Sequence, residues 1–147
     1  EEGITNQMLK VQDSIVICAP TISQVASLIA LEESYEPTLN MVREMGRRRE
    51  IICERLDRLP DLFAYHKPQG AYYIFPRIIP ERFHNSVDFC IRLLRESGVV
   101  VVPGSAFGPT GEAHVRMSYC FTREEINEAF DRIEKWWAET KRSPRSD

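Results

Sequence analysis

The stretch from His114 to Cys120 alternates apolar and polar residues, which predicts a β-strand with one buried face. The core face of this strand would carry Val115, Met117, Tyr119 and then Phe121, and the opposite face would carry His114, Arg116, Ser118 and Cys120. Arg116 has the most distinctive chemistry, because its rigid fork of N–H donors matches both oxygens of a carboxylate. No acidic residue within the strand neutralises it. The pattern alone still favours an ordinary exposed arginine, since that is the commoner case.

The segment that leads into this strand contains Gly104, Gly108 and Gly111. It is not a phosphate-binding P-loop, because no Gly-Lys-Ser/Thr follows the glycines. The glycines do permit a tight backbone path between the apolar run 99–102 and the strand that holds Arg116. The run 99–102 itself is continuously apolar, which predicts a strand buried on both faces.

The elements that must position this strand can be predicted from periodicity, capping residues and prolines. We expect helices over residues 4–17, 24–33 (capped by Thr21 or Ser23), from 35–37 to Pro60, and 86–97 with Gly98 as its stop. A capping box of Thr122 and Glu125 begins a last helix, which is expected to fray from Lys141 onward. Strands are expected over 62–66 and 71–75, in addition to 99–102 and the Arg116 strand. This order predicts an α+β fold, with a small antiparallel or mixed sheet covered by helices on one side and preceded by a long helix.

Length and composition exclude several classes of protein. The chain has 147 residues, 43% of them hydrophobic, and a net charge of −3, so it lacks the basic character of a nucleic-acid binder. No apolar run approaches the ~20 residues that a membrane span needs. Its four cysteines form no CxxC pair, so we expect no metal site and reduced core thiols in an intracellular, cytoplasmic protein. The chain begins without Met, and we expect it to be a piece of a longer protein.

For the other charged, histidine and aromatic residues we expect structural or surface roles. The run Arg47–Arg49 alternates with glutamates on the long helix and is interpreted as a solvated face. His66, His84 and His114 are scattered, so we expect surface or structural roles for them. The aromatic residues 72, 73 and 75 lack basic neighbours, which favours a core or cleft role over base stacking.

Three motifs in order resemble the C-terminal part of the class I/II aminotransferases, which are pyridoxal-phosphate enzymes of fold type I. They are Lys-Pro-Gln-Gly-Ala-Tyr-Tyr-Ile-Phe-Pro (67–76), Ser-Gly-Val-Val-Val-Val-Pro-Gly-Ser-Ala-Phe-Gly (97–108) and His-Val-Arg-Met-Ser-Tyr (114–119). The resemblance covers nearly the whole chain, because the opening residues are similar to the end of that family's large domain. It implies that residues 1–35 end the large domain and that residues 36–147 form the small, substrate-gripping domain.

The resemblance also implies roles for individual residues. Arg116 matches the arginine that grips the α-carboxylate of the amino acid or 2-oxo acid, and Tyr72 matches an aromatic position beside it. The family's Schiff-base lysine lies upstream of this chain, so no catalytic residue and no pyridoxal 5'-phosphate binding are expected here, although the intact homodimeric enzyme would use that cofactor. Two alternatives stay open: a pyridoxal-phosphate lyase or synthase of the same fold, and a non-catalytic anion-binding or dimerisation module.

Overall fold

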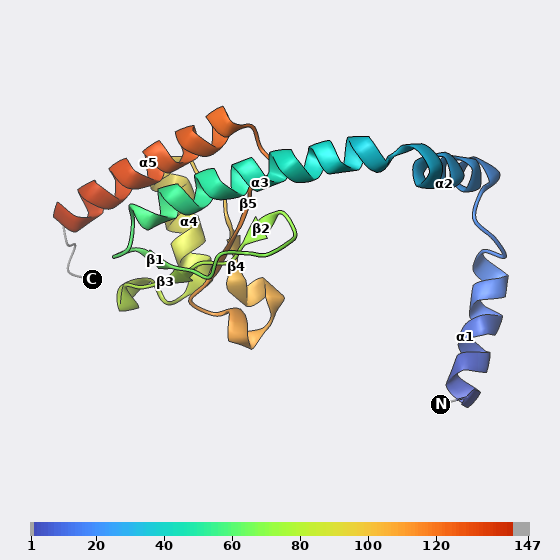
Figure 1. The fold of residues 1–147 in the computed structure, drawn as a ribbon. Helices are drawn as coiled ribbons and strands as arrows, with labels where there is room; N and C mark the ends of the chain where they lie inside the picture. Colours follow the sequence, from blue (N-terminus) through green and yellow to red (C-terminus); the bar gives the residue numbers. More distant parts are fainter. Residues whose placement is uncertain (1, 143–147) are drawn as a thin grey trace. The chain divides into compact units, whose positions relative to one another are not determined.

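The computed structural model describes residues 2–142, and its chain divides into two compact units, Glu1–Val42 and Arg43–Asp147 (Figure 1). The first unit contains α1 (Glu2–Ile15), α2 (Thr21–Glu33) and the start of α3 (Tyr35–Asp57). The expected helices are therefore present, but the predicted cap of α2 is wrong. The N-cap residue is Pro20, which has no side chain that could accept a hydrogen bond, so α2 begins at Thr21. No described residue of α1 or α2 is buried.

The second unit is built around a three-stranded antiparallel sheet in the order β2–β5–β4. Its strands are β2 (Tyr73–Ile74), β5 (Val115–Ser118) and β4 (Val102–Pro103). A second, two-stranded sheet pairs β1 (Phe63–Ala64) with β3 (Arg77–Ile78). Strand β3 was not predicted, since the expected strand over 71–75 ended before it. The small antiparallel sheets and the surrounding helices confirm the α+β fold class.

Helices α4 (Ser86–Ser97) and α5 (Arg123–Arg142) complete this unit, together with the 3₁₀ turns η1 (Glu81–Phe83), η2 (Gly104–Phe107) and η3 (Pro109–Gly111). The bounds of α4 agree with the prediction, and Gly98 follows it with a φ of 72°, as a left-handed C-terminal cap requires. The side chain of Asn85 caps its first turn. Within residues 2–142, no helix is long and apolar enough to cross a membrane.

The core of the second unit lies between the sheet and its helices. Val115, Met117 and Tyr119 are buried as expected, and the core face of α5 contributes Ile126, Phe130, Ile133, Trp136 and Trp137. Two predictions about apolar residues are wrong. Phe121 is 57% exposed, because β5 ends at Ser118 and the alternation does not continue to residue 121. Val100 is 75% exposed, because the run 99–102 meets β5 only at Val102 and lies at the edge of the sheet.

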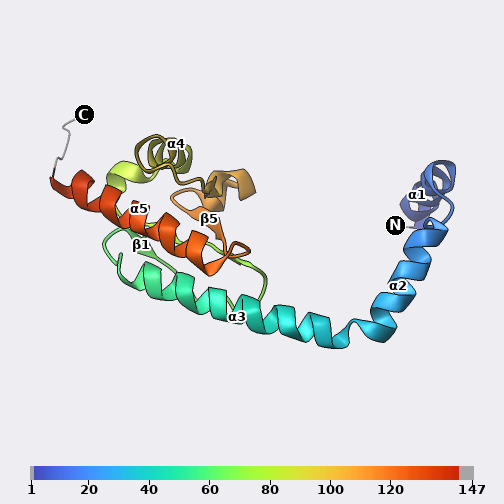
Figure 2. The same ribbon diagram turned by 90° about the horizontal axis from the view of Figure 1, so that it is seen from above.

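Helices α3 and α5 lie side by side, as both views show (Figures 1 and 2). A buried arginine of α3, Arg55, joins them, with ion pairs to Asp131 at 2.5 Å and to Glu134 at 3.1 Å. Desolvating an arginine is costly unless carboxylates compensate its charge, as these two do. The contact therefore fixes which face of α3 meets α5.

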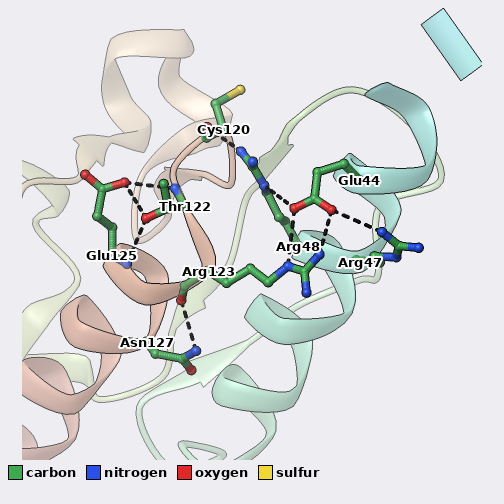
Figure 3. A network of polar contacts seen from close by, with 8 residues as sticks. All are labelled: Glu44, Arg47, Arg48, Cys120, Thr122, Arg123, Glu125 and Asn127. Atoms are coloured by element: carbon green, nitrogen blue, oxygen red, sulfur yellow. Dashed lines mark hydrogen bonds and ion pairs between the residues drawn. The ribbon is translucent and has the colours of Figure 1, made fainter. Parts of the chain in front are cut away.

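A second polar network ties the start of α5 to α3 (Figure 3). Glu44 accepts hydrogen bonds from Arg123 at 2.7 Å and from Arg48 at 3.0 Å, and these lower the pKa of its carboxyl group to about 2. Arg48 also donates to the carbonyl of Cys120 at 2.7 Å. The interpretation of residues 47–49 as a solvated face is therefore wrong for Arg48, whose side chain is only 19% exposed.

The capping box is confirmed in the same region (Figure 3). The backbone N–H of Thr122 donates to the Glu125 carboxylate at 2.8 Å, and the N–H of Glu125 donates to the Thr122 hydroxyl at 3.2 Å. The predicted fraying is not seen at Lys141, which remains in α5 and forms an ion pair with Asp61. The rest of the expected fray, residues 143–147, lies outside the described residues.

Candidate functional site

Arg116 lies in the middle of the central strand β5, on the face opposite the core. In β4 the residue paired with Arg116 is Val102. In β2, Tyr73 is paired with Ser118, which follows Arg116 by two residues and lies on the same face of β5. Arg116 and Ser118 are half-buried, whereas Val115 and Met117, which alternate with them, are buried. The predicted division of the strand into a core face and a polar face is therefore confirmed over Val115–Ser118.

Two aromatic rings hold the guanidinium of Arg116. Its Cζ atom lies 4.3 Å from the centroid of the Tyr73 ring and 4.7 Å from that of Phe107. The aromatic contacts continue beyond this pair, since Phe107 meets Phe75 edge to face at 6.0 Å and Phe75 stacks on His114 at 5.1 Å. The structure thus places Arg116 within a row of aromatic side chains from three chain segments.

The donors of Arg116 have no acceptor within the described part of the chain. Between residues 2 and 142 the structure gives it no hydrogen bond and no ion pair, whereas Arg48, Arg55 and Arg123 all contact carboxylates. A guanidinium carries five N–H donors and no acceptor, so those of Arg116 are available to an added anion. This is the arrangement that the binding of a carboxylate requires.

Tyr72, the aromatic residue that the motif suggested, lies beside Tyr73, which is one of the two rings on Arg116. Tyr72 is 45% exposed, and its ring packs against Tyr73 at 4.2 Å, while Tyr73 is the ring that covers the guanidinium. The strand register explains this, because Tyr73 is the residue paired with Ser118. A hydrogen bond with Tyr72 is the main cause that raises the pKa of Tyr73. Sequence reasoning missed Tyr73 and Phe107, although the aromatic cluster 72–75 was a signal for the first.

The loop that carries Phe107 is tightly built. Gly104 and Gly111 meet so closely that a Cβ on Gly104 would lie 2.0 Å from the carbonyl oxygen of Gly111. The hydroxyl of Ser105 in this loop accepts a hydrogen bond from the buried Ser86 hydroxyl at 2.9 Å. These contacts fix the loop against α4 and against the start of β5. The prediction of a tight glycine-dependent path is confirmed at Gly104 and Gly111.

Glu112 anchors the other end of the loop. Its carboxylate accepts hydrogen bonds from the backbone N–H of Ser86 at 2.6 Å and from its neighbour Ala113 at 3.2 Å. These hydrogen bonds lower the pKa of Glu112. Ala113 has a φ of 58°, which is uncommon for a residue other than glycine, and its strained turn leads directly into β5.

A groove of about 520 Å³ reaches Arg116 from the β4 edge of the sheet. Residues 98–102 form one wall and α5 forms the other, and most of the lining is apolar. The charged residues in the lining are Arg116, Glu125, Glu128 and Arg132. The sequence did not predict the groove, because the run 99–102 was expected to be buried on both faces.

The remaining candidate residues do not form a second site. The described residues contain no cluster of three potential metal ligands, and His114 packs on Phe75 with its Nδ1 atom 2.8 Å from the Glu112 carbonyl oxygen. Cys53 and Cys90 are buried free thiols, as expected. Cys18 and Cys120 are exposed, so the expectation of core positions is wrong for these two, which lie in the turn after α1 and in the chain after β5.

Comparisons with known proteins agree with the motifs. The sequence model described as aminotransferase class I and II matches residues 2–133. The chain belongs to this family. It shares 41% identity over 144 residues with aromatic-amino-acid aminotransferase 2 of Thermococcus litoralis, covering 95% of this chain and 36% of that protein. It is 42% identical to an aspartate aminotransferase of Pyrococcus abyssi over 142 residues, covering 94% of this chain and 35% of that one.

Solved structures of the family show the same fold. The crystal structure of an aromatic aminotransferase from Pyrococcus horikoshii superposes with a TM-score of 0.84 and 38% identity, covering 92% of this chain and 36% of that chain. The chain therefore has the fold of a fold type I region of this family, as the motifs implied. It spans about a third of the length of the relatives that it matches.

Proposed function

We propose that this chain is the substrate-gripping, C-terminal part of an aminotransferase that transfers an amino group from an amino acid to a 2-oxo acid. In this proposal residues 1–35 end the large domain and residues 36–147 form the small domain. The observation that carries the proposal is the guanidinium of Arg116, which has aromatic rings against it and no carboxylate partner within residues 2–142.

In the proposed reaction Arg116 binds the α-carboxylate of the substrate through two parallel N–H···O hydrogen bonds. Tyr72, which packs on Tyr73, lies at the edge of the same site and would contact the substrate beside this carboxylate. Binding at Arg116 would also favour closure of the small domain over the substrate, since a ligand stabilises the state in which it makes the most contacts.

Pyridoxal phosphate would supply an electron sink for the bonds to the substrate's α-carbon. The lysines described here do not fit the role of its covalent partner. Lys67 and Lys141 are ion-paired with Glu50 and Asp61, and Lys10 and Lys135 are exposed on helices. We therefore assign the cofactor and the catalytic lysine to the rest of the intact enzyme and give this chain the task of holding the substrate.

The test is the substitution of Arg116 in the full-length enzyme. Arg116→Ala leaves a desolvated carboxylate unpaired, which costs roughly 2–5 kcal/mol. By this reasoning kcat/KM for the amino acid should fall by about thirtyfold or more, mainly through a higher KM. Arg116→Lys should also be impaired, because an ammonium loses the bidentate geometry.

Arg95→Ala is a matched control, since Arg95 is an exposed arginine on α4. It removes the same charge and should leave kcat/KM close to the wild-type value. A wild-type kcat/KM for the Arg116 variants would show that another residue binds the carboxylate.

A further inference from the structure

We propose that Phe107 and Tyr73 are positioning residues that orient the Arg116 guanidinium for edge-on binding of a carboxylate. This inference rests on the proposed function, because it concerns how the same arginine meets its ligand. The ring of Phe107 has no hydrogen-bonding group, so it cannot bind a carboxylate itself. The contribution of the two rings would be to decide which way the donors of Arg116 point.

The two rings reach the guanidinium from different chain segments. Tyr73 belongs to β2 and Phe107 follows β4, and these strands flank β5 on opposite sides. The ring centroids lie 4.3 Å and 4.7 Å from Cζ of Arg116, and Tyr73 and Phe107 make no ring contact with each other. Two separate rings therefore contact the guanidinium, in contrast to an arginine that rests on a single ring.

This placement restricts how an anion can approach. The N–H donors of a guanidinium lie in its plane, and the face of an aromatic ring attracts the cation through its quadrupole. With two rings against the cation, ligand oxygens reach Arg116 along the N–H edge, which is the direction that permits a bidentate carboxylate contact. The rings also keep water from part of the guanidinium surface, which strengthens a charged hydrogen bond at the remaining edge.

The surroundings of Phe107 indicate that its position is built into the fold. Phe107 is 50% exposed, so burial in the core does not account for its place. It is held by the compact turn from Gly104 to Gly111 and by the edge-to-face contact with Phe75. Phe75 in turn stacks on His114, with the planes of the two rings only 7° apart. The row of rings thus braces Phe107.

The experiment compares two substrates that differ only in the carboxylate. The measurements use the full-length holoenzyme. The first substrate is the common L-amino acid with the highest kcat/KM. The second is the corresponding amine, which has the same side chain and lacks the α-carboxylate. Phe107→Leu removes the ring but keeps an apolar side chain, and it should raise KM for the amino acid about three- to tenfold, as expected for the loss of a cation–π contact. The kcat/KM for the amine should stay within twofold of wild type, because the amine does not use Arg116.

Three further variants make the result specific. Phe107→Tyr and Tyr73→Phe keep the rings and should retain a wild-type KM within twofold. Phe75→Leu is the matched comparison for Phe107→Leu, since Phe75 contacts Phe107 and makes no cation–π contact with Arg116. Its effect on KM for the amino acid should be clearly smaller.

The proposal is overturned if Phe107→Leu leaves KM for the amino acid unchanged, if it impairs both substrates equally, or if Phe75→Leu matches its effect. The Arg116 variants separate this failure from that of the proposed function. When Arg116→Ala is impaired and Phe107→Leu is not, only the positioning role is wrong. When neither is impaired, the assignment of Arg116 as the carboxylate ligand is wrong.

Discussion

The contact between Gly104 and Gly111 provides a sensitive test of how the loop before β5 is held. In Gly104→Ala, the new Cβ would lie 2.0 Å from the carbonyl oxygen of Gly111 and 2.7 Å from that of His114. An ordinary contact between carbon and a carbonyl oxygen is about 3.3–3.6 Å, so one of the two backbone segments must move by more than about 1 Å. No side-chain rotation can relieve the clash, because both atoms belong to the backbone.

The cost follows from what this movement breaks. The N–H of Gly104 donates to the carbonyl oxygen of His114 at 2.8 Å, and loss of such a hydrogen bond costs about 1 kcal/mol. Overpacking of a tightly packed site costs typically 1–3 kcal/mol more. We therefore expect Gly104→Ala to lower the free energy of unfolding by roughly 3 kcal/mol, which is a large part of the total stability of a domain.

Urea unfolding followed by tryptophan fluorescence is a suitable assay. Trp136 and Trp137 are the two tryptophans of the chain, and both are buried in α5 of the same unit as the loop. With a denaturant slope of about 1–3 kcal/mol per molar urea, the unfolding midpoint should fall by about 1–3 M. Gly70→Ala is the control, since a Cβ there meets no atom within 4 Å. It should be neutral or slightly stabilising, because alanine restricts the unfolded chain.

A loss below about 1 kcal/mol for Gly104→Ala, at an unchanged slope, would refute this reasoning, because the loop would then yield freely and could not hold Phe107 in place.

Two further predictions concern titration and reactivity. The pKa of Glu44 is lowered from 4.5 to about 2, so its ion pairs stabilise the fold above pH 4.5, and this contribution is lost as the pH falls toward 2. The unfolding midpoint of Glu44→Gln should therefore depend less on pH in this window than that of wild type, and equal dependence would contradict the assigned role. Burial raises the pKa of Cys53 and raises that of Cys90 to about 11. A disulfide reagent at pH 8 should modify the exposed Cys18 and Cys120 in the native protein and the two buried thiols only after unfolding.

Local sequence signals predicted the elements whose ends depend on nearby residues. The end of α4 was predicted from its stop at Gly98, and the start of α5 from the box of Thr122 and Glu125. The alternation in β5 correctly placed Val115 and Met117 in the core. Each of these features depends on residues within one turn of a helix or a few positions of a strand, so no distant partner is needed to specify it.

Predictions that depended on neighbouring elements were less successful. Continuous apolar character in residues 99–102 predicted burial on both faces, but Val100 lies at a sheet edge and is exposed, and only the strand order reveals this. The arginines of 47–49 were expected to be solvated, yet Arg48 donates to the carbonyl of Cys120, because the chain after β5 lies against α3. This contact joins residues 72 positions apart, which periodicity cannot detect.

For the candidate site, the sequence alone determined that Arg116 is on the polar face of a strand, and the family motifs singled it out as a carboxylate ligand. Only the tertiary structure decided which aromatic side chains meet it. Tyr73 reaches Arg116 through the β2–β5 register, and Phe107 reaches it because Gly104 and Gly111 fold the loop back over the strand. The physical reason is that a cation–π contact needs a ring within about 6 Å of the charge, and that distance is set by the packing of three chain segments.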